Sequence, residues 1–482
     1  MKLAVVVQRY GADINGGAEL HARYLAQRLA RHADVEVLTT RARDYVTWKN
    51  ELPDGDELVD GVRVRRFPVA RERHPEDFGR RSALVFGHRH SIADELGWLE
   101  SEGPTSPQLI RYLKRHASAW DYVLFFSYRY YHAWHGARAV PSKAILVPTA
   151  ERDPAAGLAI FGSLFRGVRA VMYNSLEERA LIQAATSNQD VPGVVVGIGS
   201  DVAERPIPQR FRREHRIKGP FAIYVGRIDE NKGCRELFEY FDRYARTFPG
   251  GLPLVLLGNA LMPIPSKPWI RHLGYVSDEA KFDAIAASDL LIMPSYYESL
   301  SMVALEAWGM GKPVLANGKC DVLRGQCIRS NAGLYYESFD EFAEALYALE
   351  ASGPLNAILG RNGREYFRQH YAWPVIERKY LEMFERLKQE DQSGGSRSIE
   401  PLPGWFARRR RDVPPAKETL AGLPTGPVAA KETRAAPSTH AAVRSPRADT
   451  RSMPDSRGPK RVDRGPRREG RRWHRSTRSS RR

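Results

Sequence analysis

Short apolar runs alternate with amphipathic helical patterns along most of the chain, beginning at its first residues. Residues 3–7 form an apolar run typical of a buried strand, and apolar residues then recur at helical spacing between 20 and 29. Another apolar run, VEVLTT, follows at 35–40. This order predicts a strand, a helix and a parallel strand, which is the repeating unit of an α/β sheet.

The same alternation continues to about residue 390 and is interrupted once. Residues 194–208, VVVGIGSDVAERPIP, end one apolar run and pass into a connector that contains proline. The length suits two α/β domains of ordinary size. We therefore expect an amino-terminal Rossmann-like domain over 1–198 and a carboxy-terminal one over 199–390.

Charge separates the remainder, residues 391–482, from these domains. It has 23 Lys and Arg against 9 Asp and Glu, so it carries +14 of the chain's net +17. With few apolar residues, it is predicted to be a disordered basic tail. Its charge would suit anionic lipid or nucleic acid, or it is a solvated extension without a partner. Aromatic residues for base stacking are scarce, so no specific nucleic-acid partner is expected.

Two carboxylates stand eight residues apart in ESLSMVALEAWGMGKP, across the start of a predicted helix that follows a buried strand. Ligands of α/β sheets bind at the carboxyl ends of strands, where the next helix begins. Glu298 and Glu306 would lie roughly 12 Å apart along the axis if both were helical, which suits an extended ligand. Between them, free backbone amides would face a pyrophosphate at Leu300, Ser301, Met302 and Val303. A capped helix with two solvated glutamates is the plain structural alternative.

A second strand, loop and helix pattern supplies cations. FAIYVGRIDENKG, residues 221–233, presents Arg227 and Lys232 in the loop. A guanidinium can bind two phosphate oxygens, and an ammonium is a compact point charge, so together they can neutralise a diphosphate leaving group. Singly, each would be read as solvated surface charge.

These motifs resemble the retaining glycosyltransferases of family 4, whose GT-B fold sets two Rossmann-like domains facing across a cleft. The resemblance rests on GRIDENKG, on the two spaced glutamates, on GKPVLAN at 311–317 and on GGAE at 16–19. It implies that Arg227 and Lys232 bind the diphosphate, Glu298 the sugar hydroxyls and Glu306 the ribose. In this fold the last helix typically returns to the first domain.

The resemblance also assigns the amino-terminal loop, where Gly16 and Gly17 would approach the donor phosphates and Glu19 would lie beside them. A glycine at a helix start allows close approach of an anion. A plain strand-to-helix turn is the alternative. One departure is Ser301, which replaces a glycine of the family pattern. Serine is small enough to leave the amide available, so this is a variant site rather than an inactive one.

The acceptor side departs further from the family. Members often have a histidine after the strand that corresponds to 143–148, whereas here Glu151, Arg152 and Asp153 follow. Glu151 or Asp153 could orient the acceptor hydroxyl or support a developing oxocarbenium charge. A solvated loop at the strand end is equally consistent with the residues. Ser175 and Glu178, in contrast, have the spacing of a structural capping box.

The sequence thus predicts a retaining, metal-independent hexosyltransferase-like enzyme that uses no cofactor. Its partners would be a UDP- or GDP-sugar donor and a saccharide or lipid-linked acceptor in cell-surface polysaccharide or glycolipid synthesis. A GT-B epimerase and a donor-binding protein without turnover remain alternatives. Three cysteines without a C-x-x-C pair favour a reducing cytoplasm. Basic residues at 63–90 allow peripheral contact with the inner face of an anionic membrane, or form a solvated face.

Overall fold

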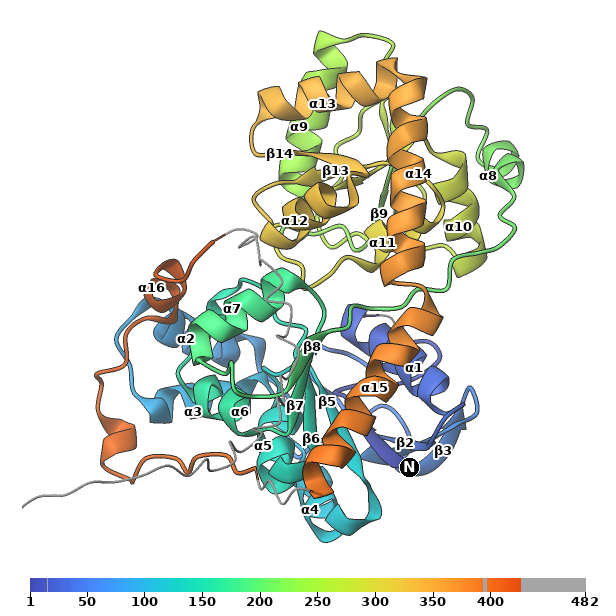
Figure 1. Cartoon of the computed structure of the whole chain (residues 1–482). Coiled ribbons are helices and arrows are strands. Elements are labelled where there is room, and N and C mark those ends of the chain that lie inside the picture. Colours follow the sequence, from blue (N-terminus) through green and yellow to red (C-terminus); the bar gives the residue numbers. More distant parts are fainter. Residues whose placement is uncertain (15, 393–396, 426–482) are drawn as a thin grey trace, which may run out of the picture. The chain divides into compact units, whose positions relative to one another are not determined.

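The structure, a computed structural model, describes residues 1–14, 16–392 and 397–425. The first domain is built on an eight-stranded sheet of order β3-β4-β2-β1-β5-β6-β7-β8 (Figure 1). All neighbouring strands are parallel except β3 and β4. The strands are β1 Lys2–Val6, β2 Asp34–Thr40, β3 Gly55–Val59, β4 Val62–Phe67, β5 Tyr122–Phe126, β6 Ala144–Val147, β7 Ala170–Tyr173 and β8 Gly193–Val195.

The second domain is built on a six-stranded, all-parallel sheet of order β11-β10-β9-β12-β13-β14. The direction of winding reverses between β9 and β12, and ligands of such sheets bind outside the carboxyl ends of strands at this reversal. The strands are β9 Ala222–Val225, β10 Leu254–Leu257, β11 Ile270–His272, β12 Leu290–Met293, β13 Val314–Asn317 and β14 Gly333–Tyr336. The predicted α/β fold class is therefore confirmed.

Helices cover both faces of each sheet, and each face has its own apolar core. Those of the first domain are α1 Gly17–Leu29, α2 Pro75–Gly87, α3 Ile92–Glu102, α4 Pro107–Arg115, α5 Tyr131–Ala139, α6 Ile160–Gly167 and α7 Leu176–Thr186, with 3-10 turns η1 Ala117–Ala119, η2 Pro141–Lys143 and η3 Pro154–Gly157. Those that follow are α8 Pro208–Glu214, α9 Cys234–Thr247, α10 Asp278–Ala287, α11 Met302–Gly309, α12 Asp321–Ser330, α13 Phe339–Ala351, α14 Gly353–His370 and α15 Trp373–Gln392.

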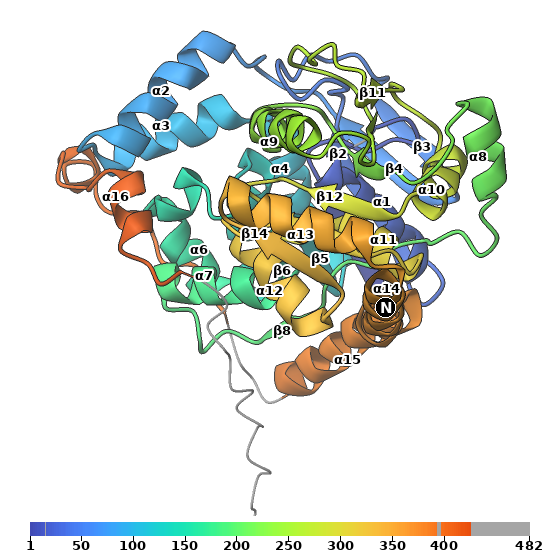
Figure 2. The same cartoon turned by 90° about the horizontal axis from the view of Figure 1, so that it is seen from above.

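The last long helix belongs to the core of the first domain. Figures 1 and 2 show α14 passing into α15, which leaves the second sheet and runs beside α1. Its apolar face, which includes Trp373, Tyr380 and Leu387, packs with β1, β2 and β5. The Arg28 guanidinium of α1 lies 5.0 Å from the centre of the Trp373 ring. The chain therefore passes between the domains twice, once at 196–207 and once at 371–372.

The segment 397–425 corrects the prediction that the chain is disordered from residue 391. It contains a 3-10 turn, η4 Ala407–Arg409, and a short helix, α16 Ala416–Ala421. Leu402 packs on the core of the first domain, Ala416 is fully buried there, and Arg152 donates to the carbonyls of Leu423 and Pro424. Composition could not reveal this, because a few contacts with a surface that is already folded are enough to order the segment. The rest of the predicted tail, 426–482, lies outside the described residues.

Among the residues that the structure describes, no helix combines the length and the apolarity needed to span a bilayer.

Candidate functional site

The loops after β9 and β12 meet at the reversal of the second sheet. The Lys232 ammonium lies 2.7 Å from Glu298 Oε1, and both side chains are largely buried. Gly233 permits this contact, because it has φ of 71° and a Cβ there would collide with the Pro294 carbonyl. Burial disfavours the Lys232 cation, but Glu298 and Glu151 outweigh it and raise the Lys232 pKa.

Glu298 lies in the loop before a helix, so the two glutamates stand across the helix start and are not both helical. The helix α11 begins at Met302, so the spacing of Glu298 and Glu306 does not follow a helix axis. The hydroxyl of Ser301 accepts from the Ala304 N–H at 3.3 Å and caps this helix. N–H groups in the first turn of a helix have no acceptor within it. The amides of Met302 and Val303 are therefore available to an anion, while Leu300 and Ser301 are buried beside them.

Glu306 lies on α11 with a side chain that is almost completely buried. Its Oε1 accepts from Lys281 Nζ at 2.9 Å and is 3.4 Å from the Ser200 hydroxyl. Burial opposes the Lys281 charge, but the Glu306 carboxylate raises the pKa of Lys281 to about 12. Glu306 Oε2 has no hydrogen-bond partner within the described part of the chain. A buried acceptor without a partner is costly, so this oxygen is suited to receive a ligand hydroxyl.

Arg227 follows Gly226, the first residue after β9. Its guanidinium pairs with Asp229 and lies 5.5 Å from the centre of the Tyr45 ring, which belongs to the first domain. Its side chain is 41% exposed, so the cation can still reach a ligand. The structure thus places Arg227, Lys232 and Glu298 in two adjacent loops, with Glu306 behind them on α11.

The two glycines of the amino-terminal loop differ. Gly16 is the N-cap of α1, and a Cβ there would collide with the carboxylate of Glu19. Glu19 itself accepts from Arg9 Nη2 at 2.6 Å and is buried, so it has a structural partner. A Cβ on Gly17, in contrast, would meet nothing within 4 Å. Of these two described glycines, Gly17 is therefore the one whose Cβ position faces open space.

Glu151 and Asp153 have different surroundings. Burial raises the pKa of Glu151 to about 7, with Lys232 opposing the rise and Glu298 adding to it. Asp153 instead accepts from the Ala155 N–H at 3.1 Å and pairs with Arg129. Of the two candidates on the acceptor side, Glu151 is therefore the one associated with the Lys232 and Glu298 pair.

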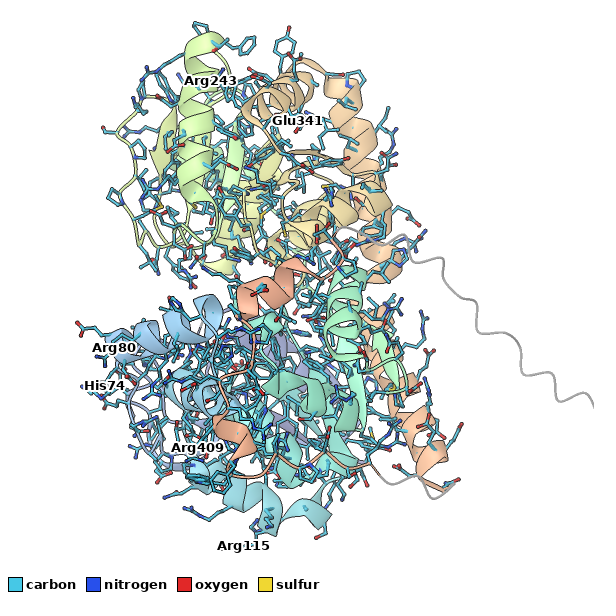
Figure 3. The ribbon with its side chains drawn as sticks, turned by 90° about the vertical axis from the view of Figure 1, so that its left-hand side faces the viewer. His74, Arg80, Arg115, Arg243, Glu341 and Arg409 are labelled. Carbon is cyan, nitrogen blue, oxygen red and sulfur yellow. The ribbon has the colours of Figure 1, made fainter. Side chains whose placement is uncertain are left out.

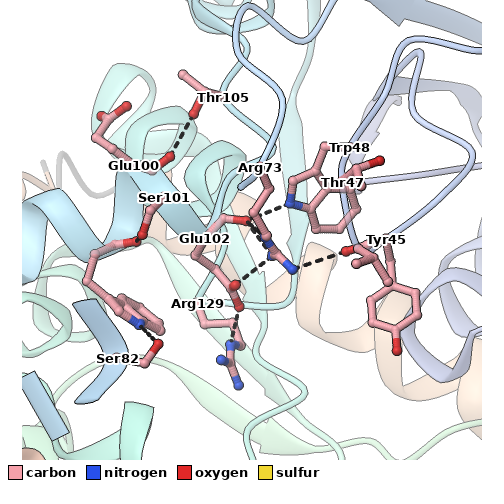
Figure 4. A network of polar contacts seen from close by, with 12 residues as sticks. Tyr45, Thr47, Trp48, Arg73, Ser82, Glu100, Ser101, Glu102, Thr105 and Arg129 are labelled. Atoms are coloured by element: carbon pink, nitrogen blue, oxygen red, sulfur yellow. Dashed lines mark hydrogen bonds and ion pairs between the residues drawn. The ribbon is translucent and has the colours of Figure 1, made fainter. Parts of the chain in front are cut away.

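A network of charged side chains holds Arg129 in place (Figure 4). Glu102 Oε1 accepts from Arg129 Nε at 2.8 Å, and Glu102 Oε2 accepts from Arg73 Nη2 at 2.6 Å. Arg73 also donates to the Tyr45 carbonyl at 3.1 Å. Asp153 is therefore one end of a partly buried structural network, which its place in the sequence did not indicate.

Glu178 has a larger role than the capping box predicted for it. The Ser175 hydroxyl accepts from the Glu178 N–H at 3.1 Å, as such a cap requires. The Glu178 carboxylate, however, accepts from the Ala150 N–H at 2.5 Å and also from the Asn174 N–H. It therefore fixes the loop that carries Glu151. Burial raises its pKa to about 8. Local spacing predicted the cap, but the contact of the Ala150 N–H with the Glu178 carboxylate arises only in the folded chain.

A pocket opens beside Glu298, between loop and helix residues of both domains. It is lined on one side by Ala150 and Arg152 and on the other by Tyr296, Tyr297 and Asp321. Pro424, from the segment that follows α15, completes its wall. Among the described residues, no group of three His, Cys, Asp or Glu side chains is arranged to hold a metal ion.

The buried carboxyls predict how stability depends on pH. Glu178 has a pKa of about 8 in the fold against an ordinary value of 4.5, so the folded state binds more protons between these values. The free energy of unfolding should therefore fall as pH rises through this window. The side chain of Glu178→Gln binds no proton in either state, so the free energy of unfolding of this variant should fall less as pH rises. Urea unfolding at about pH 6 and about pH 8.5 measures the difference.

Glu344→Gln is the matched control, because Glu344 is exposed on α13. It should show the same decline as the parent. An equal decline in the parent and in Glu178→Gln would contradict the raised pKa of Glu178.

Comparison with known proteins supports a glycosyltransferase. Residues 219–351 match a family model described as "Glycosyl transferases group 1". The chain is 25% identical to the glycogen synthase of Mycobacterium tuberculosis, over 66% of this chain and 78% of that protein. It is 23% identical to the D-inositol 3-phosphate glycosyltransferase of Corynebacterium urealyticum, over 80% and 95% of the two chains.

Solved structures share the fold. Sucrose-phosphate synthase from Thermosynechococcus elongatus aligns with a TM-score of 0.60 and 16% identity, over 81% of this chain and 99% of that one. Anabaena HepE in complex with UDP-glucose aligns with a TM-score of 0.58 and 17% identity, over 80% and 100%. The chain therefore has the GT-B fold. Residues 219–351 correspond to a group 1 glycosyltransferase domain. This range contains Arg227, Lys232, Glu298 and Glu306.

Proposed function

We propose that the protein is a retaining glycosyltransferase that moves a sugar from a nucleoside diphosphate donor to an acceptor hydroxyl without a metal ion. The contact of Lys232 with Glu298 carries the proposal, because it joins a cation for phosphate to a carboxylate for sugar hydroxyls at the reversal of the second sheet. The likeness to HepE, which was solved with UDP-glucose, supports a nucleotide sugar as the donor.

Each end of the donor has a matching group. The unpartnered Oε2 of Glu306 would accept a hydrogen bond from a ribose hydroxyl. Arg227 and Lys232, together with the amides at the start of α11, would bind the diphosphate. Glu298 would exchange part of its contact with Lys232 for hydroxyls of the donor sugar. The two cations would then neutralise the charge that grows on the leaving diphosphate, which is the role otherwise taken by a metal.

Retention would follow from attack on the face that the diphosphate leaves. The departing phosphate would take the acceptor proton, so the reaction requires no protein nucleophile. Glu151 lies beside this region, and with a pKa of about 7 it could hold a proton near the reacting carbons. The acceptor would enter the pocket beside Glu298, where the rings of Tyr296 and Tyr297 suit a saccharide or a lipid-linked sugar. We further propose that the enzyme acts in the cytoplasm on precursors of cell-surface glycans.

A thermal-shift screen of uridine and guanosine diphosphate sugars tests donor binding and identifies the base. A donor at a hundred times its dissociation constant should stabilise the fold by about 2.7 kcal/mol. Glu306→Gln should reduce this shift for the matching donor. Absence of any shift across both series would argue against a nucleotide sugar as the ligand.

Gly17→Val tests the contribution of the first domain. A side chain at Gly17 meets open space, so the variant should fold as the parent does. In the proposed complex the donor phosphates fill that space, so turnover should fall about a hundredfold, the loss expected when a preorganised contact is removed. Binding of free diphosphate, measured by calorimetry, should remain detectable. Normal turnover in Gly17→Val would contradict a contribution of Gly17 and would favour a donor site that lies within the second domain.

A further inference from the structure

The segment after α15 holds an exposed loop, residues 404–412, on the surface of the first domain. The chain is fixed before the loop by Leu402, which packs on the core, and after it by Val413, whose N–H and carbonyl each bond to His90 at 3.1 Å. Arg89 also donates to the Asp412 carbonyl at 3.0 Å. The loop is therefore presented by anchored backbone, and its side chains have a defined place on the surface.

Two large aromatic side chains project from this loop. Phe406 is 82% exposed and Trp405 is 56% exposed. Their ring centres lie 4.8 Å apart, with the ring planes nearly perpendicular. Exposed apolar residues that occur singly need no explanation, but these two adjacent rings form one exposed apolar patch within the described part of the chain, and such patches can mark interaction sites.

Arginines surround this aromatic pair. Arg408 to Arg411 follow it after Ala407, and all but Arg408 are exposed. The Arg409 guanidinium lies 4.0 Å from the centre of the Trp405 ring and donates to the Trp405 carbonyl at 3.3 Å. Figure 3 labels Arg409 on the first domain. The surface around the aromatic rings is therefore cationic.

We propose that Trp405 and Phe406, with Arg409 to Arg411, form a docking surface for an anionic lipid bilayer. Tryptophan is favoured at the level of lipid headgroups, and phenylalanine can enter the apolar boundary below them. Arginine binds lipid phosphates and is attracted by the negative surface potential. The inference does not rest on the proposed transfer reaction, because it concerns a surface that contains none of the residues of the Lys232 and Glu298 site.

The geometry favours a bilayer over single-stranded nucleic acid. Stacking on bases requires open ring faces. Here Arg409 covers one face of Trp405, and Phe406 meets that ring nearly at right angles, so no flat platform is presented. Two exposed rings with flanking cations are suited instead to a deformable interface, which needs no complementary pocket.

Co-sedimentation of the full chain with vesicles tests the proposal. The parent should bind vesicles that contain phosphatidylglycerol more tightly than vesicles of phosphatidylcholine alone. Trp405→Ser with Phe406→Ser should weaken binding to the anionic vesicles about tenfold or more, because both rings lose their burial in the interface. Arg410→Gln with Arg411→Gln should weaken it as well and reduce its dependence on salt. The basic residues 426–482 are present in every variant, so their contribution to the comparison cancels.

Leu58→Ser is the matched control, because Leu58 is 71% exposed on β3 and lies outside the loop. It should bind vesicles as the parent does, and all variants should keep the parent's thermal unfolding and donor-induced shift. Equal vesicle binding by the parent and the double serine variant would overturn the proposal and leave charge alone as the cause. A loss of oligonucleotide binding in that variant without a loss of vesicle binding would also overturn it, in favour of a nucleic-acid surface.

Discussion

Lys232→Ala should lower turnover about a hundredfold or more, with a smaller loss of donor affinity. The ammonium would interact most strongly with the charge that grows on the leaving diphosphate, so its removal raises the barrier more than it weakens binding. The variant also leaves Glu298 and the nearby Glu151 without their shared cation. Steady-state release of nucleoside diphosphate, together with calorimetric titration of the donor, measures the two effects separately.

Arg235→Ala is the matched control for this variant. Arg235 lies on α9, three residues beyond Lys232, but its side chain is exposed and pairs with Glu230 at the surface. It should keep the parent's turnover. A folded Lys232→Ala protein with near-normal turnover would contradict the proposal that this loop binds the diphosphate.

Glu306→Ala and Glu298→Ala should fail in different ways. Loss of Glu306 removes the acceptor proposed for ribose, so affinity for the free nucleoside diphosphate should fall about tenfold to a hundredfold, as expected for a hydrogen bond to a charged group. Loss of Glu298 releases Lys232 from its ion pair, so diphosphate affinity should be kept or should rise. Sugar transfer should nevertheless fall strongly in Glu298→Ala. Calorimetry with the diphosphate and with the intact donor distinguishes the two.

Glu306→Gln separates the ligand contact from the fold. Glu306→Ala removes the buried carboxylate partner of Lys281 and leaves only the exposed Asp278, which can destabilise the protein by itself. Glutamine keeps the size of the side chain and one acceptor oxygen. Thermal unfolding of both variants therefore shows how much of any loss is structural. Equal losses of diphosphate affinity in Glu298→Ala and Glu306→Gln would contradict the proposed division between sugar and ribose.

The fold was predictable because its signals are local. Short apolar runs at 221–225 and 290–293 form β9 and β12, and Ser175 begins a helix where its spacing predicts. The order of strands and helices then leaves few topologies for a parallel sheet. The adjacency of the loops that carry Arg227 and Glu298 follows from this topology.

The rest of the candidate site depends on contacts between distant segments. The pairing of Asp153 with Arg129, and of Glu178 with the Ala150 N–H, joins residues that no periodicity relates. Whether Glu298 is helical could not be decided from sequence, because a residue just before a helix has the same spacing as one within it. The ordered segment 397–425 was missed because its composition is that of a solvated chain, while its anchors lie on another part of the molecule.

The most direct test of the central claim is the fate of a donor that the thermal-shift screen selects. The parent is incubated with that donor and a panel of alkyl glycosides, with a chelator present, and the products are followed by proton NMR. We expect the parent to release nucleoside diphosphate and to form a new glycoside with the donor's anomeric configuration. Both products should be absent with Lys232→Ala. A donor that binds but stays intact, a donor whose sugar is epimerised without transfer, or a glycoside of inverted configuration would contradict the central claim.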